Sequence, residues 1–331
     1  MTGLATALDH VGVAVPDLDA AATEWAALGF TVQPLAPHMA DGTPAGTNGH
    51  RVPTGTDGQR VPTGTDGQRV PTGTGGQRVP TGTGGQRVPT GTGNRNIMLR
   101  EGYIELLATI DPARPSATIA RFLAHHTGIH VLTLATDDAD AALARLATAG
   151  FSAAIARSAR PADPAAPDGP QAAFARIPLA EADPRLQLLH HLTPALVWQE
   201  RFLSHPNRAI ALREVIVAAD APAAFAARLA RAAGLPLVPD PAGGLALRLP
   251  GVRLPGVHLP GGAVRVLPPD AATRLLPGAA IPALPAILGL VVQTDDSART
   301  AAALLGHSDA GPVHRPVWGR ASGVTVVFSG S

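Results

Sequence analysis

A layout of an apolar run followed by an alanine-rich stretch recurs four times, and it constrains the fold more than any other feature. DHVGVAVPDLDAAATEWAALGF (9–30) and IHVLTLATDDADAALARLATAGF (129–151) share a histidine, an acidic turn and a final glycine with an aromatic residue. EVIVAADAPAAFAARLARAAGL (214–235) and LGLVVQTDDSARTAAALLG (288–306) carry Glu214 and Leu288 at the histidine position. In each copy, apolar residues first alternate with other residues and then recur at helical spacing, which predicts a strand followed by a helix.

The first copy shows which residues lie on each face of its predicted strand. Its valines at 11, 13 and 15 alternate with His10, Gly12 and Ala14, so His10 is expected on the sheet face opposite the valines. Asp17 is placed to cap the helix and Gly29 to end it. The valine row and the apolar stripe of the helix should therefore pack together, leaving His10 on the other face.

Further strands are predicted after each of the first two copies. They cover residues 30–35, 96–100, 103–110, 151–158, 171–179 and 185–192. A connecting helix is expected over 116–128, with Ser116 as its cap, Gly128 as its stop and His125 and His126 in its last turn. Each copy therefore begins a βαβββ unit.

A nonapeptide, RVPTGTDGQ and its variants, is repeated over residues 51–95. It is rich in Gly, Thr and Pro and has one valine per copy as its largest apolar residue, so it predicts a disordered loop over about 46–94. Only Asp57 and Asp66 supply carboxylates, which argues against a calcium-binding β-roll. The nearly identical copies indicate a tandem duplication inserted between two strands.

Composition excludes several functions. The chain has no cysteine, so disulfides, thiolate metal sites and a cysteine nucleophile are excluded. A net charge of +1 and 3% aromatic residues provide no basic stripe or stacking surface for nucleic acid. No basic leader and no apolar run long enough for a membrane span is present, so a cytoplasmic protein is expected.

The DHVGVAVPDLDAA opening, GTGNRNIML, the closing strand GYIELLATIDP and HLTPALVWQERFLSHPN (191–207) resemble the vicinal oxygen chelate superfamily. Within it, the chain is most similar to the bacterial glyoxalase-like domain proteins. The resemblance implies an α+β fold of tandem βαβββ units, in two paired modules with curled mixed sheets. The expected modules are residues 1–207 and a degenerate second module over 208–331 that lacks the ligand set.

The resemblance also implies a site for one divalent metal, Zn, Ni, Mn or Fe. His10, Glu105 and His130 match the superfamily's ligand positions, and Glu105 is also the candidate catalytic residue. Aligning LQLL with IELL gives Gln187 as the fourth ligand, whereas a small shift would present His190 or His191 instead. The alternative is that both histidines are hydrogen-bonded interior residues and that Glu105 pairs with an arginine.

Two classes of function follow from this resemblance. The first is a metal-dependent lyase or isomerase of the glyoxalase type acting on a small oxygenated metabolite, with extradiol dioxygenase as a less favoured variant. The second is a non-catalytic protein that binds or sequesters a small molecule, as drug-resistance proteins do. The glyoxalase pattern usually has a second Glu at the fourth position, and its absence favours the second class. Homo-oligomerisation stays open, and neither nucleic acid nor membrane is an expected partner.

Overall fold

The computed structural model describes residues 4–41, 87–166, 168–179, 183–254, 257–305 and 317–330. Its contacts divide the chain into one unit of Met1–Ala40 with Pro89–Ser331 and a second of Asp41–Val88. Most of the nonapeptide repeat, and with it the predicted loop as far as residue 86, lies outside the described residues. The last repeat does not match the prediction, because its residues from Arg87 onward belong to a strand.

The first βαβββ segment surrounds Glu105. It consists of β1 (Ala7–Ala14), α1 (Leu18–Ala27), β2 (Ala36–Asp41), β3 (Arg87–Met98) and β4 (Tyr103–Thr109). The strands lie in the order β1-β4-β3-β2, with β1 parallel to β4 and β3 antiparallel to it. Asp17 caps α1 as expected, accepting from the backbone N–H groups of Asp19 and Ala20.

The second segment repeats this order. After α2 (Ala117–Leu123) come β5 (Gly128–Ala135), α3 (Ala139–Thr148), β6 (Ala156–Pro161), β7 (Gln171–Pro178) and β8 (Arg185–His191). The strands follow the order β5-β8-β7-β6, with β5 parallel to β8. Two 3-10 turns, η1 (Pro194–Leu196) and η2 (Glu200–Phe202), lead to the C-terminal half.

The C-terminal half again begins each segment with a strand and a helix. Its elements are β9 (Ala209–Ala218), α4 (Pro222–Ala233), β10 (Leu237–Pro239), β11 (Leu245–Arg248), β12 (Gly251–Leu254), β13 (Val257–Pro260), β14 (Ala263–Leu267), α5 (Pro269–Leu275), β15 (Ala286–Thr294), α6 (Ser297–Leu305), β16 (Val317–Ala321) and β17 (Val324–Gly330). β9 is parallel to β14, and β15 is parallel to β17. β12 and β13 form a separate hairpin.

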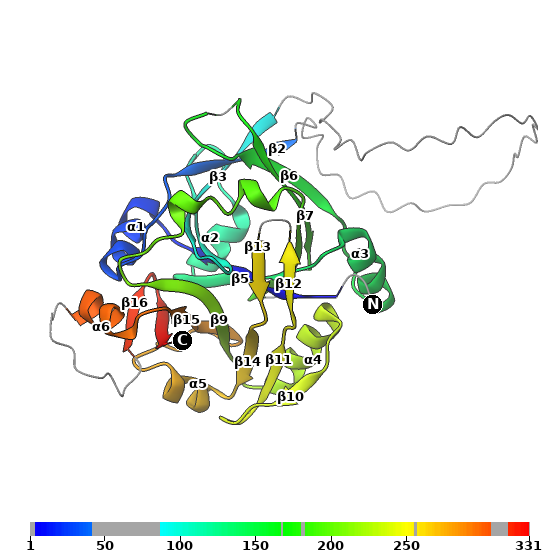
Figure 1. Cartoon of the computed structure of the whole chain (residues 1–331). Helices are drawn as coiled ribbons and strands as arrows, with labels where there is room; N and C mark the ends of the chain where they lie inside the picture. Colours follow the sequence, from blue (N-terminus) through cyan, green and yellow to red (C-terminus); the bar gives the residue numbers. More distant parts are fainter. Residues whose placement is uncertain are drawn as a thin grey trace, which may run out of the picture. The chain divides into compact units, whose positions relative to one another are not determined.

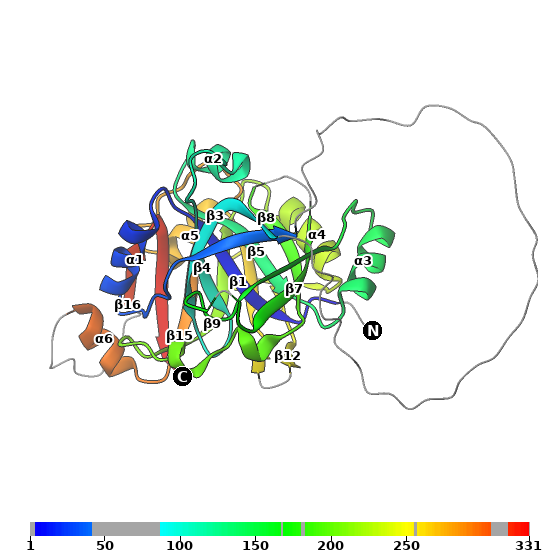
Figure 2. The same ribbon diagram turned by 90° about the horizontal axis from the view of Figure 1, so that it is seen from above.

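Among the described residues, all strands except this hairpin join one 15-stranded sheet, with the helices packed around it (Figures 1 and 2). The α+β class is confirmed. The two halves are linked by the pair Ile129 and Ile287, where β5 meets β15. The strands therefore form one continuous network. The module boundary between residues 207 and 208 stays a prediction.

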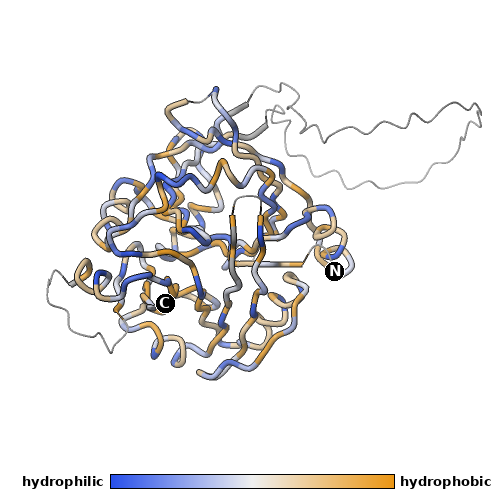
Figure 3. Tube along the Cα trace, in the orientation of Figure 1, coloured by the Kyte–Doolittle hydropathy of each residue, from blue (hydrophilic) through white to orange (hydrophobic). Residues whose placement is uncertain are grey.

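The predicted packing of the first segment is present. Val11, Val13 and Val15 share one buried cluster with Leu18 and Trp25 of α1. The peripheral helices carry hydrophobic and hydrophilic residues side by side along the trace, as expected for elements with one buried face (Figure 3). No helix among the described residues is long and apolar enough to cross a membrane.

Three predicted boundaries were wrong. The strands expected over 30–35 and 151–158 begin later, at Ala36 and Ala156, because the preceding residues cross from the helix layer to the sheet edge. The connecting helix, capped by Ser116 as expected, ends at Leu123. His125 and His126 therefore follow the helix, and Gly128 opens β5.

Two irregularities in the β1–β5 ladder shape the centre of the sheet. Leu8 pairs with Leu134 and His10 with Thr133, so Asp9 is an extra residue on β1. On β5, His130 is extra, because Gly12 pairs with Val131 and Val13 with Ile129. Such β-bulges turn a side chain away from its regular direction and are common beside active sites.

The β9–β15 ladder has irregularities at the matching places. Arg213, directly before Glu214, is extra on β9, and Leu288 is extra on β15. Arg213 corresponds to Asp9, and Leu288 to His130, in the alignment of the four copies. The backbone of the C-terminal half therefore supports the equivalence of these positions, although their side chains differ.

Candidate functional site

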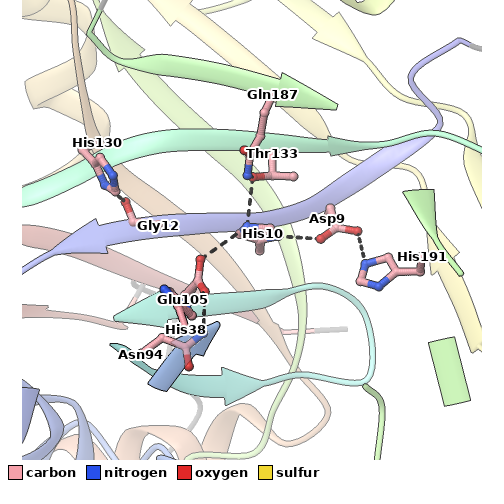
Figure 4. Close-up of polar contacts among 10 residues, drawn as sticks. All are labelled: Asp9, His10, Gly12, His38, Asn94, Glu105, His130, Thr133, Gln187 and His191. Carbon is pink, nitrogen blue, oxygen red and sulfur yellow. Dashed lines mark hydrogen bonds and ion pairs between the residues drawn. The ribbon is translucent and has the colours of Figure 1, made fainter. Parts of the chain in front are cut away.

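A strip of buried polar side chains lies on the sheet face opposite the valines, between two apolar clusters. One cluster contains Tyr103, Trp198 and Phe174, and the other contains Ile119 and Phe122 of α2. The polar residues between them come from β1, β3, β5 and β8: Asp9, His10, Asn94, Asn96, His130, Thr133, Gln187 and His191. Figure 4 shows most of this group with Glu105 and His38.

Asp9 holds two histidines at the centre of the strip. Its carboxylate lies 2.6 Å from Nδ1 of His10 and 2.7 Å from Nε2 of His191, and it is completely buried. Burial by itself would raise the pKa of Asp9, but His191 and His10 lower that pKa to about 2. The ionised carboxylate only accepts hydrogen bonds, so the Nδ1–H of His10 must point to Asp9. Nε2 of His10 then faces the other side.

Glu105 is the residue that Nε2 of His10 faces. Its Oε2 lies 3.6 Å from that nitrogen, and its Oε1 lies 3.6 Å from Nε2 of His38 and accepts from Asn94 at 2.5 Å. Burial would raise the pKa of Glu105, whereas His38, His10 and Asn94 hold it below its usual range. Glu105 has no arginine among these contacts, which differs from the alternative weighed for the sequence.

Gln187 joins the same group through Thr133. The Gln187 amide donates to Oγ1 of Thr133 at 2.7 Å, and that hydroxyl lies 3.0 Å from Nε2 of His10. The register explains the contact, because Thr133 pairs with His10 across β1 and with Gln187 across β8. Three neighbouring strands therefore bring His10, Thr133 and Gln187 to one face.

His130 lies further along the strip, towards α2. Its Nδ1 is 3.0 Å from the carbonyl of Gly12, and its ring lies 5.5 Å from that of Phe122. Burial lowers the pKa of His130 to about 4, so the ring is neutral at pH 7. A Cβ at position 12 would come within 3.4 Å of Cε1 of His130 and closer still to Val131, so a glycine is needed at this approach.

The described residues contain no group of three or more His, Cys, Asp or Glu side chains placed to hold a metal ion. The structure brings His10 and Glu105 together, connects Gln187 to them through Thr133, and places His130 apart on the same face (Figure 4). His191 faces Asp9, so its neighbour His190 faces the opposite side of β8. The four-residue ligand set stays a prediction.

Sequence reasoning missed Asp9, His38, Asn94 and Thr133. Asp9 stood beside His10 in the DH dipeptide, but regular alternation would have put it on the other face. Only the bulge turns it towards His10 and His191. His38 belongs to a strand that the sequence placed six residues too early. Asn94 was the last residue of the predicted loop, and only the structure shows its hydrogen bond to Glu105.

The C-terminal half carries an ion-pair cluster at the matching place. Arg265 of β14 donates to Glu214 at 3.0 Å and to both oxygens of Asp240, at 2.7 and 2.8 Å. Arg265 lowers the pKa of Asp240, and Asp240 in turn raises that of Arg265. Glu214 and Arg265 stand where His10 and Glu105 stand in the first segment, because both pairs are offset by two residues along parallel strands.

Fold and site together define a protein of the vicinal oxygen chelate superfamily. A comparison with protein families matches residues 8–54 and 69–233 to the glyoxalase-like domain, which is more than half of the chain. The chain therefore belongs to the glyoxalase-like domain family, as its motifs predicted. Residues 55–68, inside the nonapeptide repeat, and everything after residue 233 lie outside the match.

One solved structure shows the same fold, and two others are reported beside it. The chain is similar to a hypothetical protein from Staphylococcus aureus, with 10% identity, 98% of this chain and 99% of that chain covered, and a TM-score of 0.57. A mutant of 4-hydroxymandelate synthase from Streptomyces coelicolor has 16% identity, coverage of 92% and 75%, and a TM-score of 0.49. Methylmalonyl-CoA epimerase from Mycobacterium tuberculosis has 18% identity, coverage of 60% and 96%, and a TM-score of 0.32. A comparison with curated proteins found no match.

Proposed function

We propose that the chain binds a small oxygenated metabolite at the His10–Glu105 site and acts on it as a metal-dependent lyase or isomerase of the glyoxalase type. The observation that carries the proposal is the pairing of Nε2 of His10 with Oε2 of Glu105 at 3.6 Å, on a buried polar strip. An imidazole nitrogen that carries no proton and a carboxylate oxygen are both electron-pair donors. Facing each other at this distance, they favour a cation between them.

The chemistry of the donors fits a divalent ion. His10 has its Nδ1 held by the Asp9 carboxylate, and His130 has its Nδ1 held by the Gly12 carbonyl. Metal-binding histidines typically have their second ring nitrogen tied in this way, which leaves the other nitrogen as ligand. His10, Glu105, His130 and Gln187 would hold the ion. When bound, the ion would polarise the oxygens of the metabolite.

The residues of the chain have separate tasks in this proposal. Asp9 and His191 orient His10, and Asn94 orients Glu105 through its 2.5 Å hydrogen bond. His38, His10 and Asn94 lower the pKa of Glu105 and keep it ionised, which suits a carboxylate that holds a metal ion, and Glu105 is also the candidate catalytic residue of this proposal. His38, whose side chain is 28% exposed, lies on the solvent side of Glu105.

A second candidate is a binding protein without turnover. Its support is the fourth position, where the Gln187 amide donates to Thr133 and no carboxylate stands opposite Glu105. An amide is a weak metal ligand and no base. Such a protein would use the same strip to hold an oxygenated molecule by hydrogen bonds.

Metal content separates these candidates. Protein purified without chelator should carry about one divalent ion per chain by elemental analysis, and His10→Ala should lose it. His125→Ala is the matched control, because His125 is exposed and should leave the metal content unchanged. Metal-free wild-type protein that takes up neither Zn²⁺ nor Mn²⁺ on dialysis would contradict the metal-dependent enzyme and favour the binding protein.

A further inference from the structure

The β12–β13 hairpin is an insertion that the other segments do not share. It lies between β11 and β14, whereas β3 is joined to β4 by a short turn over residues 99–102. Its two arms contain the sequences GVRL and VHLP, which belong to a five-residue repeat over residues 249–262. The glyoxalase-like match ends at residue 233, so the hairpin is also outside that family domain.

The hairpin does not extend the sheet of its own half. It pairs only with itself, and its arms contact β1 of the N-terminal half. The backbone N–H of Gly251 donates to the carbonyl of Thr6 at 2.6 Å, which fixes one arm at the start of β1. Figure 1 shows the two arms reaching from β11 and β14 towards the N-terminal strands.

The inner side chains of the hairpin pack on the apolar end of the polar strip. Val257 and Leu259 are buried in one cluster with Tyr103 and Trp198, and Val252 and Leu254 pack against it. Tyr103 stacks on His10 with ring centroids 4.4 Å apart, and Trp198 lies 4.8 Å from His191. The cluster that contains the hairpin side chains therefore reaches both histidines that Asp9 holds, through Tyr103 and Trp198.

Polar atoms in this region are left without partners among the described residues. Nε1 of Trp198 and Nδ1 of His191 are buried without a hydrogen bond, and so is Oδ1 of Asn96 on the opposite side of Glu105. Buried polar groups normally have a partner, so unpaired ones at a site indicate where a polar molecule or water is held. Two of these unpaired atoms, on Trp198 and His191, thus lie next to the apolar cover, whereas Asn96 lies opposite Glu105 on β3.

We propose that the β12–β13 hairpin closes the apolar end of the His10–Glu105 site and limits the size of the ligand that the site admits. The ligand class is a small molecule with neighbouring oxygens and a short apolar part directed towards Tyr103 and Trp198. The ligand class rests on the proposed function, whereas the closure by the hairpin does not. The C-terminal half thereby supplies a wall to a site whose polar groups all come from the N-terminal half.

A variant without the hairpin can be built with little disturbance. The N–H of Leu249 donates to the carbonyl of Gly262 at 2.9 Å, so the chain ends already lie at the distance of a tight turn. Replacing residues 250–261 by Asn-Gly should close them as a two-residue hairpin. Circular dichroism checks the fold. Leu259→Ala in the intact hairpin is a milder second variant, and Arg253→Ala, at an exposed position, is its control.

Diethyl pyrocarbonate labelling, mapped by peptide mass spectrometry, measures closure directly. Without the hairpin, His10 and His191 should react several-fold faster, whereas His205, buried elsewhere, should not change. Leu259→Ala should act in the same direction and Arg253→Ala should not. Unchanged rates at His10 and His191 in both the hairpinless variant and Leu259→Ala would overturn the closure. If His205 also accelerates, the hairpinless variant is unfolded and Leu259→Ala decides.

Binding of pyruvate and phenylpyruvate, measured by calorimetry in the presence of Mn²⁺, tests the size limit. The wild-type chain should bind pyruvate more tightly than phenylpyruvate. In the hairpinless variant, the affinity for phenylpyruvate relative to that for pyruvate should rise by about tenfold or more. An unchanged affinity ratio would overturn the size limit. If neither the wild-type chain nor the hairpinless variant binds pyruvate or phenylpyruvate, the proposed binding of neighbouring oxygens at this site is wrong. The labelling result still decides whether the hairpin closes the site.

Discussion

At the residue scale, the site depends on hydrogen bonds that fix how each side chain is held. Asp9 decides which nitrogen of His10 is free, because its carboxylate lies 2.6 Å from Nδ1. Asn94 and His38 both contact Oε1 of Glu105, which leaves Oε2 facing His10. His205 shows the same principle away from the site: its Nδ1 accepts from the N–H of Thr31 at 3.0 Å, and its Nε2–H donates to the carbonyl of Met98 at 2.8 Å.

His205 should make stability depend on pH. Burial lowers the pKa of His205, so below about pH 6.5 the unfolded chain takes up a proton that the folded chain does not, and stability falls. His205→Gln should cost about 1–3 kcal/mol at pH 7.5, because two buried partners lose their hydrogen bonds. It should also lose less stability between pH 7.5 and 5.5 than the wild type.

Urea unfolding at the two pH values measures both effects. His125→Gln, at an exposed position, serves as control and should follow the wild type. If His205→Gln and the wild type lost the same free energy of unfolding between pH 7.5 and 5.5, the His205 ring would not contribute to the pH dependence of stability.

At the element scale, the strand that resumes after the nonapeptide repeat is part of the site. β3 places Asn94 opposite Leu107 and Asn96 opposite Glu105, and its pairing with β4 extends to Thr92. Thr92 and Asn94 lie inside the loop predicted over about 46–94, and their pairing with β4 corrects the end of that loop. The strand continues from this ladder back to Arg87, beyond the last residue that pairs with β4, although its sequence is rich in Gly and Thr.

Deleting residues 51–86 should therefore leave the fold intact. The deletion removes repeats that precede β3, and for the loop that their composition predicts, shortening changes the closure entropy by only about 1 kcal/mol or less. Thermal unfolding and the metal content of the shortened chain should match the wild type. A second deletion, of residues 87–94, removes part of the paired strand and should destabilise the protein. A shortened 51–86 chain that fails to fold would give the repeat a structural role.

At the scale of the whole molecule, the two halves repeat one backbone plan with different chemistry. Bulges occur at Asp9 and His130 in one half and at Arg213 and Leu288 in the other. The first half uses these positions for a polar strip with unpaired atoms. The second has Arg265 between Glu214 and Asp240, so its charges satisfy each other. We therefore expect one ligand site per chain, in the N-terminal half.

Removing Arg265 tests the structural role of that cluster. Arg265→Met leaves Asp240, whose side chain is 2% exposed, without its cation and should cost about 3 kcal/mol in the free energy of unfolding. Arg274→Met is the matched control, because its ion pair with Asp270 is exposed and should contribute less than about 1 kcal/mol. Chemical denaturation measures both variants. Equal losses would mean that the cluster is not a buried ion-pair network.

Much of the fold was predictable because periodicity determines which face of its own element a side chain occupies. It placed His10 opposite the valines and Glu105 on a closing strand, and the structure has these two side chains facing each other. The strands predicted over residues 30–35 and 151–158 were misplaced for a related reason. Apolar residues there pack on the core as the chain crosses between layers, so their composition resembles that of a strand.

The sequence alone therefore determined the strand and helix order of the first two segments, the family, and the face on which His10 lies. Only the tertiary structure decided that Asp9 and His191 meet, that Thr133 links Gln187 to His10, and that a hairpin from the C-terminal half covers this end of the strip. The physical reason is register. A contact between distant strands depends on their alignment, and one extra residue in a bulge turns a side chain to the other face.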